Sequence, residues 1–212
     1  MDDHTDGGGR AAATGPDRTL PVPDRLLSAA TRLFAERGFE RTSVQELVAA
    51  AGVTKGAMYH YFASKDDLLY AVYQRVLAMQ TERLAGFAAA EGPIEDRLRA
   101  AAADVVHTTV DNLDDTRIFF RSLHMLPEDK LAAVRKERRA YHERFRGMIE
   151  EGQRTGALRA DVPADIAVTQ FFGAVHHLST WYRPEGELSG AAVGAYFADL
   201  FLAGLRSPDA AR

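Results

Sequence analysis

The segment GVTKGAMYHYFASKDDL, residues 52–68, places basic, aromatic and small side chains within about two helical turns. Thr54 can cap a short helix there. On this helix Met58, Tyr61 and Phe62 follow an i, i+3, i+4 pattern, which predicts that they face a core. The other side chains would point outward, where cations and a phenol can bind phosphates or base edges and a glycine lets a backbone approach closely. The outward face that would fit a DNA groove consists of Lys55, Gly56, Tyr59 and His60.

The elements around this segment have the spacing of a helix-turn-helix. Two helices of about two turns meet at Gly52 and follow a longer helix, and in this motif the second short helix enters the DNA major groove. Thr42 or Ser43 can cap the first of the two short helices. The polar residues expected to hold the flanking DNA backbone are Thr42, Ser43, Gln45 and Lys65.

The rest of the chain also favours helices, because no stretch has the alternating, β-branched pattern of a strand. Prolines mark further helix starts, so we expect an all-α fold of about nine helices. Residues 1–21 have almost no large apolar side chain and should form a disordered arm. We place a helix-turn-helix DNA-binding domain at 22–68, a helical ligand-binding and dimerisation domain at 69–206 and a frayed tail at 207–212.

The composition is that of a globular protein, with 46% hydrophobic residues in a chain of 212. The lack of cysteine excludes disulfides and thiolate metal sites. No apolar run approaches the ~20 residues of a membrane span and the acidic, glycine-rich start is unlike a leader, so we expect a cytoplasmic protein with no membrane partner. The net charge of −4 is uneven: residues 24–65 carry six Lys or Arg against four Asp or Glu, a balance that would suit any surface.

Signatures of catalysis are lacking in the sequence. Neither G-x-S-x-G nor H-E-x-x-H occurs, and the glycines at 7–9 follow no strand, so they do not form a phosphate loop. Asp104 with His107, and His176 with His177, could serve acid–base or metal chemistry, but histidines in a core or interface are the commoner case. We expect no enzyme, no catalytic residue, no metal and no cofactor. The alternative is an all-helical enzyme or small-molecule carrier whose N-terminal helices are only a scaffold.

The stretch FAERGFERTSVQELVAAAGVTKGAMYHYFASKDDLL, residues 34–69, closely resembles the DNA-binding domain of tetracycline-repressor-like (TetR family) transcriptional regulators. It contains the F-x-x-x-G-(F/Y)-x-x-T-(S/T) opening and the G-V-(S/T)-x-G-x-(L/M)-Y-x-(H/Y)-F-x-(S/N)-K ending of that domain. The resemblance implies a ligand-responsive regulator, commonly a repressor, that binds a palindromic operator in double-stranded DNA as a homodimer. Its recognition helices would lie about 34 Å apart.

The same resemblance assigns roles to single residues. Tyr59 and Lys65 match positions that usually contact phosphate. The recognition-helix positions, whose identity varies with the operator, are matched by Lys55, Gly56, Ala57 and His60. Together with the capping residue Thr54 and the flanking polar residues, these positions form the DNA-binding set.

The last two long helices are expected to form the dimer interface. They are apolar with small residues interleaved, which permits close helix approach, and we expect them to pair with their symmetry mates in a four-helix bundle. The alternative is that they complete the core of each subunit. The expected interface residues are Phe172, Val175, Leu178, Ala191, Ala195, Ala198 and Leu202.

Apolar pockets between helices of a bundle are common ligand sites, and the central helices are rich in aromatic and flexible apolar side chains. The expected pocket residues are Phe87, Phe119, Phe120, Leu123, Tyr141, Phe145, Met148, Gln170, Phe171 and His176. The segment STWYRPEGELS, residues 179–189, resembles members of the family that respond to acyl-coenzyme A thioesters. Such an effector would place its acyl chain in the pocket and its phosphates on the basic run VRKERRAYHERFR. A solvated, ion-paired helix face is the alternative for that run.

Overall fold

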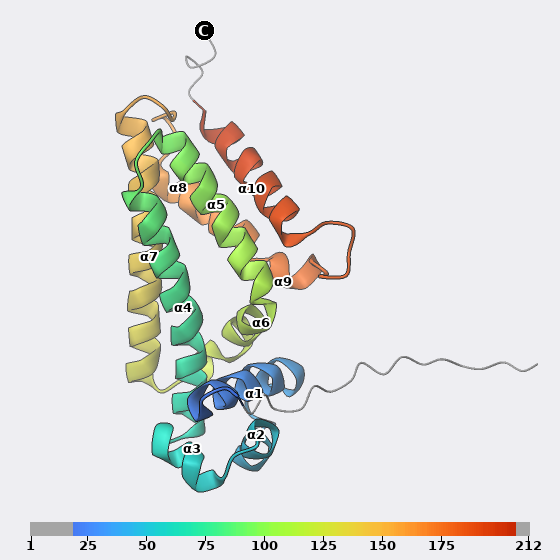
Figure 1. The fold of residues 1–212 in the computed structure, drawn as a ribbon. Coiled ribbons are helices and arrows are strands. Elements are labelled where there is room, and N and C mark those ends of the chain that lie inside the picture. Colours follow the sequence, from blue (N-terminus) through green and yellow to red (C-terminus); the bar gives the residue numbers. More distant parts are fainter. Residues whose placement is uncertain (1–18, 207–212) are drawn as a thin grey trace, which may run out of the picture.

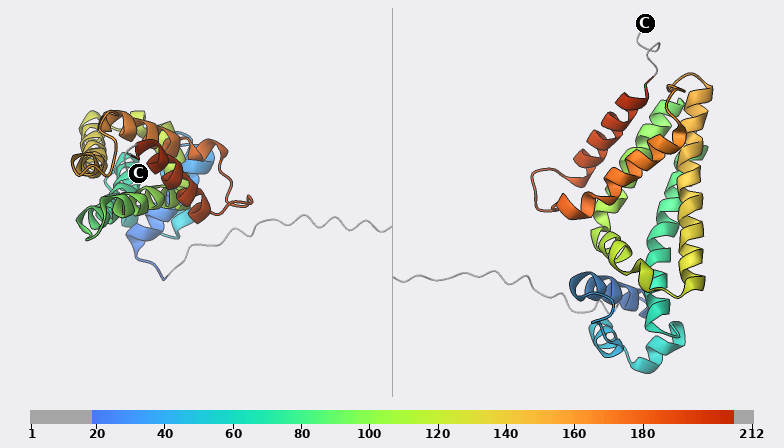
Figure 2. Two further views of the ribbon diagram at one scale, coloured as in Figure 1. Left: turned by 90° about the horizontal axis from the view of Figure 1, so that it is seen from above. Right: turned by 180° about the vertical axis from the view of Figure 1, so that it is seen from behind.

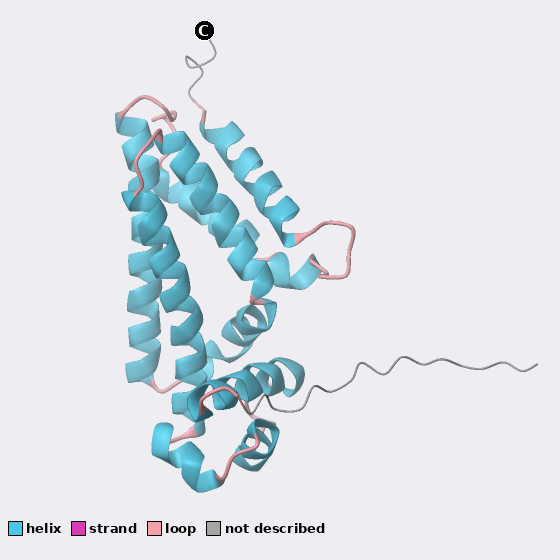
Figure 3. Cartoon of the chain, in the orientation of Figure 1, coloured by secondary structure: helices cyan, strands magenta, loops and turns pink. Residues whose placement is uncertain are grey.

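The computed structural model describes residues 19–206, and within this range the chain forms helices and no strand (Figure 3). The all-α fold expected from the sequence is therefore confirmed. The expected arm lies largely, and the expected tail entirely, outside the described range. The elements are α1 (Val22–Arg37), α2 (Val44–Ala51), α3 (Lys55–Tyr61), α4 (Lys65–Ala89), α5 (Ile94–Asp111), α6 (Leu113–Ser122), η1 (Leu123–Met125), α7 (Glu128–Arg154), α8 (Ala164–His176), α9 (Leu178–Trp181) and α10 (Gly190–Leu205).

Local side-chain bonds fix the starts of the short helices. The Ser43 hydroxyl accepts from the Glu46 amide at 3.2 Å, while the Glu46 carboxylate accepts from the Ser43 amide at 2.8 Å, which completes a capping box. Gly52 ends α2 in the left-handed conformation, with φ 63° and ψ 39°. Thr54 then caps α3 through the Ala57 amide at 3.1 Å. These bonds set the angle between α2 and α3.

Two apolar cores stabilise the chain. One core joins α1, α2 and α3 to the start of α4 and extends to Ile118 of α6 and Leu131 of α7. The other core lies among the distal part of α4, α5, α7, α8 and α10. The long helices α4 and α7 run side by side from the small N-terminal group of helices into the larger group (Figures 1 and 2). The boundary expected between residues 68 and 69 falls inside α4, so a continuous helix connects the two parts.

Helices α5 and α10 lie in close backbone contact. A Cβ atom at Gly194 would lie 2.7 Å from the Ala103 carbonyl oxygen, which is closer than real Cβ contacts. The glycine therefore permits this approach. The pair covers one side of the larger core, and α8 lies behind α5 in Figure 1 and in front of it in the rear view of Figure 2.

Candidate DNA-reading helix and effector cavity

Helix α3 lies at the end of the molecule farthest from the larger core (Figure 1). Met58 is fully buried and anchors the helix, as expected. Lys55, Gly56 and His60 are exposed, and 49% of Tyr59 is accessible. The expectation for Tyr61 was wrong: this side chain is also 49% exposed, and its ring packs edge-to-face on His60 with centroids 4.8 Å apart. The outer face of α3 is thus more aromatic than the sequence pattern predicted.

At the start of α2, the structure exposes some of the expected DNA-contact residues and buries another. Thr42 is fully buried, and its hydroxyl donates to the Gly38 carbonyl at 2.8 Å. This side chain closes the turn after α1 and cannot reach DNA, which corrects its assignment. The Ser43 hydroxyl is engaged in the capping box, whereas Gln45 is exposed. Gln45 therefore remains a predicted DNA contact with its amide available.

Lys65 has a structural task that its spacing in the sequence did not reveal. Its Nζ donates to the Phe39 carbonyl at 2.8 Å and to the Thr42 carbonyl at 3.0 Å, and it lies 4.2 Å from the centre of the Phe39 ring. Two of its three N–H groups are therefore used to hold the turn before α2 against α4. Its role as a phosphate contact stays a prediction for the remaining N–H.

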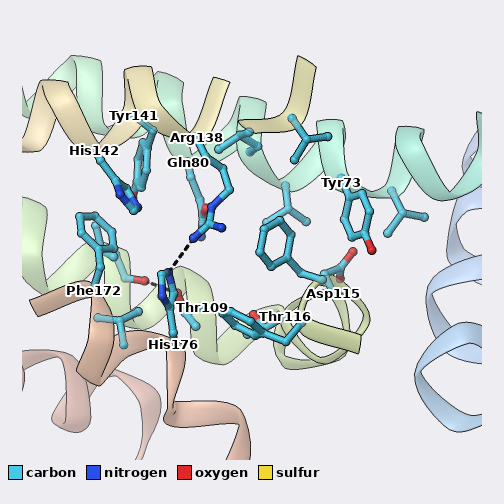
Figure 4. Close-up of a pocket in the computed structure, with 18 residues that line it drawn as sticks. Tyr73, Gln80, Thr109, Asp115, Thr116, Arg138, Tyr141, His142, Phe172 and His176 are labelled. Carbon is cyan, nitrogen blue, oxygen red and sulfur yellow. Dashed lines mark hydrogen bonds between the residues drawn. The ribbon is translucent and has the colours of Figure 1, made fainter. Parts of the chain in front are cut away.

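A cavity lies between α4, α5, α6, α7 and α8 (Figure 4), with a volume of about 90 Å³. Four of the expected pocket residues line it: Phe119, Phe120, Tyr141 and His176. The other six do not. Phe145, Met148 and Phe171 fill the larger core, Phe87 and Leu123 pack against the two cores, and Gln170 is exposed.

The polar part of the cavity is formed by an arginine and two histidines. Arg138 of α7 points into the cavity, where its guanidinium lies 3.2 Å from His176 Nε2 and its central carbon 4.3 Å from the centre of the Phe119 ring (Figure 4). His142 stacks on Phe172 with centroids 4.2 Å apart. Burial, and then the nearby Arg138 charge, lower the pKa of both His142 and His176 to about 4. Both imidazoles are therefore neutral at pH 7.

Asp115 of α6 connects this cavity to the DNA-reading end. It is buried at the cavity wall, and its carboxylate accepts from Arg75 at 3.1 Å and from Thr31 of α1 at 3.4 Å. Burial raises the pKa of Asp115, although the Arg75 charge opposes this shift. Neither Asp115 nor His142 was expected at the site. The only signal for Asp115 in the sequence was its spacing, one helical turn before the apolar residues Ile118 and Phe119.

The expected dimer residues are mostly inside the subunit, which corrects their assignment. Phe172 and Val175 line the cavity, and Leu178, Ala198 and Leu202 are buried in the larger core, so none can touch a second chain. Ala191 and Ala195 are exposed. The exposed large side chains of the same helices lie at other positions, which are Ile166 on α8, Trp181 on α9, and Tyr196 and Leu200 on α10.

The fold and the outer face of α3 define a helix-turn-helix regulator, and the comparisons agree. Residues 26–72 match the profile for bacterial regulatory proteins of the tetR family, and residues 91–205 match that for the tetracyclin repressor-like C-terminal domain. The chain belongs to the TetR family, which confirms the resemblance found in the sequence.

Relatives and solved structures extend over most of the chain. The HTH-type transcriptional repressor KstR2 of Mycolicibacterium smegmatis is 31% identical over 207 residues, which cover 90% of this chain and 93% of the relative. The ketosteroid transcriptional regulator KstR2 of Mycobacterium tuberculosis has a similar structure, with a TM-score of 0.80 and 20% identity over 92% of this chain and 100% of that chain. AibR in complex with isovaleryl coenzyme A and operator DNA has a TM-score of 0.74 and 23% identity, covering 88% and 98%. At these identities the two structures show the fold.

Two features are absent from the described residues. None of the helices within residues 19–206 combines the length and apolar character needed to cross a membrane. In the same range, no cluster of three or more His, Cys, Asp or Glu side chains is arranged to hold a metal ion.

Proposed function

We propose that this chain is a transcriptional repressor that binds a palindromic operator as a homodimer and releases it when an effector enters the cavity. The outer face of α3 is the observation that carries this proposal. Lys55 and Tyr59 are exposed there, with no hydrogen bond or ion pair to another described residue, on a helix held in place by buried Met58. Such a rigid polar face meets the requirement for reading a groove. The protein then acts in the cytoplasm, by binding and not by catalysis.

Within this face we assign distinct tasks to the side chains. The Tyr59 hydroxyl binds a phosphate, and the cations or polar rings of Lys55 and His60 reach base edges. Gly56 and Ala57 are small enough to let α3 enter the groove. Thr54, which caps α3, and Gln45 are placed to hold the flanking backbone. Replacing Tyr59 should weaken binding to every sequence, whereas replacing His60 should change the sequence preference.

The dimer is assigned to the exposed face of α8 and α10. Ile166 is 61% exposed and Leu200 is 75% exposed, on two helices of the larger core, and large apolar side chains exposed to water are unfavourable. Tyr196 and the small residues Ala191 and Ala195 extend this face along α10. A second copy packed on it by a twofold axis would form a four-helix bundle and hold two α3 helices at groove spacing.

Release requires that the effector bind the DNA-free form of the repressor more tightly than the DNA-bound form, and we assign this difference in affinity to the cavity. A dry cavity of about 150 Å³ binds benzene, so we expect an effector of that size or larger to enter this smaller cavity of about 90 Å³ by moving its walls. Asp115 lies in one wall and bonds Thr31 of α1. Movement of α6 would therefore displace α1 and, with it, α3, which packs on α1. An effector that needs this movement binds the displaced arrangement, which cannot read DNA, more tightly than the DNA-bound arrangement.

An acyl-coenzyme A is the effector class that we propose. Two surface grooves adjoin the cavity. One shares Phe120 and His176 with it and is lined by Arg117, Arg121 and Arg183. The other shares Arg138 and His142 and is lined by Arg135, Arg139 and Arg146, which extends the basic run on α7.

The groove between α6 and α9 is the better phosphate site. In the groove on α7, Arg146 is within 4 Å of three carboxylates, those of Glu143, Glu150 and Asp165, so much of its charge is neutralised. In the α6 groove, Arg121 has no carboxylate partner among the described residues. The AibR complex with isovaleryl coenzyme A supports the same effector class.

Selection of bound sequences from random DNA tests the proposal directly. We expect a palindrome with half-sites about one helical turn apart, and release of that DNA by an acyl-coenzyme A but not by free coenzyme A. Binding to no palindrome at low salt would refute the operator. The rival reading, an all-helical enzyme or carrier, predicts effector binding without any effect on DNA.

A further inference from the structure

The Arg138 guanidinium is partly buried, where the cavity meets the groove on α7, and it has no counter-ion among the described residues. Its contacts within residues 19–206 are the His176 nitrogen at 3.2 Å and the face of Phe119 at 4.3 Å. Neither contact is an anion. Burial lowers the pKa of Arg138, which reflects this loss of hydration. A guanidinium nevertheless stays protonated in proteins, so the cavity contains a permanent positive charge.

The acids around the cavity are already engaged. Asp115, which lines the same cavity, is paired with Arg75 at 3.1 Å. Glu143, one turn along α7, is paired with Arg146 at 2.7 Å. No carboxylate among the described residues lies within 4 Å of Arg138, and a buried charge is costly unless it is paired. No residue in the described part of the chain supplies this partner, which leaves the place open to a bound anion.

We infer that the cavity is a carboxylate receptor, in which Arg138 binds a carboxylate at the buried end of an apolar effector. The planar guanidinium offers two parallel N–H groups that match a carboxylate, and the bonds gain strength in an environment that excludes water. Thr109 and Gln80 line the same cavity and add neutral polar groups beside it. This inference rests on the proposed function, because it takes the cavity as the effector site.

The charge balance of the cavity selects a monoanion. His142 and His176 are neutral at pH 7 because burial and the Arg138 charge lower the pKa of each to about 4. Asp115 and Arg75 cancel one another, so one net positive charge remains. A carboxylate neutralises it, whereas a phosphate would carry further charge and oxygens into walls formed by Phe119, Phe172 and other apolar side chains. Phosphates fit better in the groove between α6 and α9, which lies outside the cavity.

Two sources could deliver this carboxylate: a free carboxylic acid, or an acyl-coenzyme A whose acyl chain ends in a second carboxylate. Calorimetric titration of the full chain distinguishes them with two matched pairs. The first pair is octanoate and octanamide, and the second is the monothioester octanedioyl-coenzyme A and octanoyl-coenzyme A. We expect the carboxylate member of at least one pair to bind about 10- to 100-fold more tightly than its neutral counterpart.

Arg138→Met should reduce this ratio to about one, and Arg154→Met, which removes an exposed arginine at the end of α7 outside the cavity and both grooves, should leave it unchanged. Arg138→Met should also raise Tm by a few degrees, because an uncompensated buried charge is replaced by an apolar side chain. Equal affinities within both pairs, or a carboxylate preference that persists in Arg138→Met, would overturn the inference. Because these titrations contain no DNA, their failure leaves operator binding as a separate question.

Discussion

Replacement of Gly56 by alanine separates what α3 does for stability from what it does for DNA. Gly56 is the second residue of α3 and is exposed. An added Cβ would meet only the Thr54 hydroxyl oxygen, at 3.9 Å, which is an ordinary contact. The chain itself therefore has no need for glycine here. If the proposed function is correct, the need comes from DNA, which must approach the backbone at this position.

The expected magnitudes have opposite signs. Alanine loses less conformational entropy than glycine in a helix, so Gly56→Ala should stabilise the fold by up to about 1 kcal/mol. For a chain of 212 residues this raises Tm by about 1 to 4 °C. A methyl group forced against the groove costs about 1 to 3 kcal/mol in each half-site, by analogy with overpacked cores. Operator affinity should therefore fall by about 5- to 150-fold for each half-site.

Thermal unfolding by circular dichroism and anisotropy titration on the selected operator measure the two effects. Gly86→Ala is the matched control, because Gly86 is an exposed position within α4 where an added Cβ meets nothing within 4 Å. It should raise Tm by a similar amount and leave DNA affinity unchanged. A lower Tm for Gly56→Ala would show that the fold itself needs glycine at this position. Unchanged operator affinity would refute the view that DNA closely approaches α3 at Gly56.

Three further predictions concern the phenol, the dimer face and pH. Tyr59→Phe should weaken binding by about 3- to 10-fold on all DNA sequences through loss of a phosphate bond while Tm stays constant, as gel shift and calorimetry would report. Leu200→Arg should reduce the molar mass measured by light scattering to that of one chain; a persistent dimer would place the interface elsewhere. Between pH 6.5 and 4 the unfolded chain binds a proton at His142 and at His176, whereas the folded chain keeps both partly buried imidazoles neutral. The free energy of unfolding should therefore fall by up to about 3 kcal/mol per histidine as pH is lowered, and His176→Asn should reduce this slope by about half in urea titrations.

Local signals allowed the sequence to predict the helix-turn-helix and much of its outer face. The capping bonds of Ser43 and Thr54 each span three residues, so each donor lies close to its acceptor in the sequence. The glycine that ends α2 is also a local requirement of a left-handed residue. Lys55, Tyr59 and His60 were expected to be exposed, and they are.

Thr42 and Lys65, near the same helices, have structural partners that their residue types did not reveal. Thr42 bonds the Gly38 carbonyl and lies near that of Leu33, and Lys65 bonds carbonyls 23 and 26 residues away. Both have the residue types of a phosphate contact, and only the tertiary structure shows that a carbonyl takes that place.

The sequence by itself determined the class of fold, the cap of α3 and most of the face of α3 that is available to DNA, because these depend on contacts within one or two turns. Only the tertiary structure decided which face of α8 and α10 is buried. Both helices are apolar nearly all round, so their sequence gives no preferred phase, and burial of Phe172 or exposure of Leu200 follows from packing against α5 and α7. The same packing brings Arg138, His142 and His176 from two helices into one cavity.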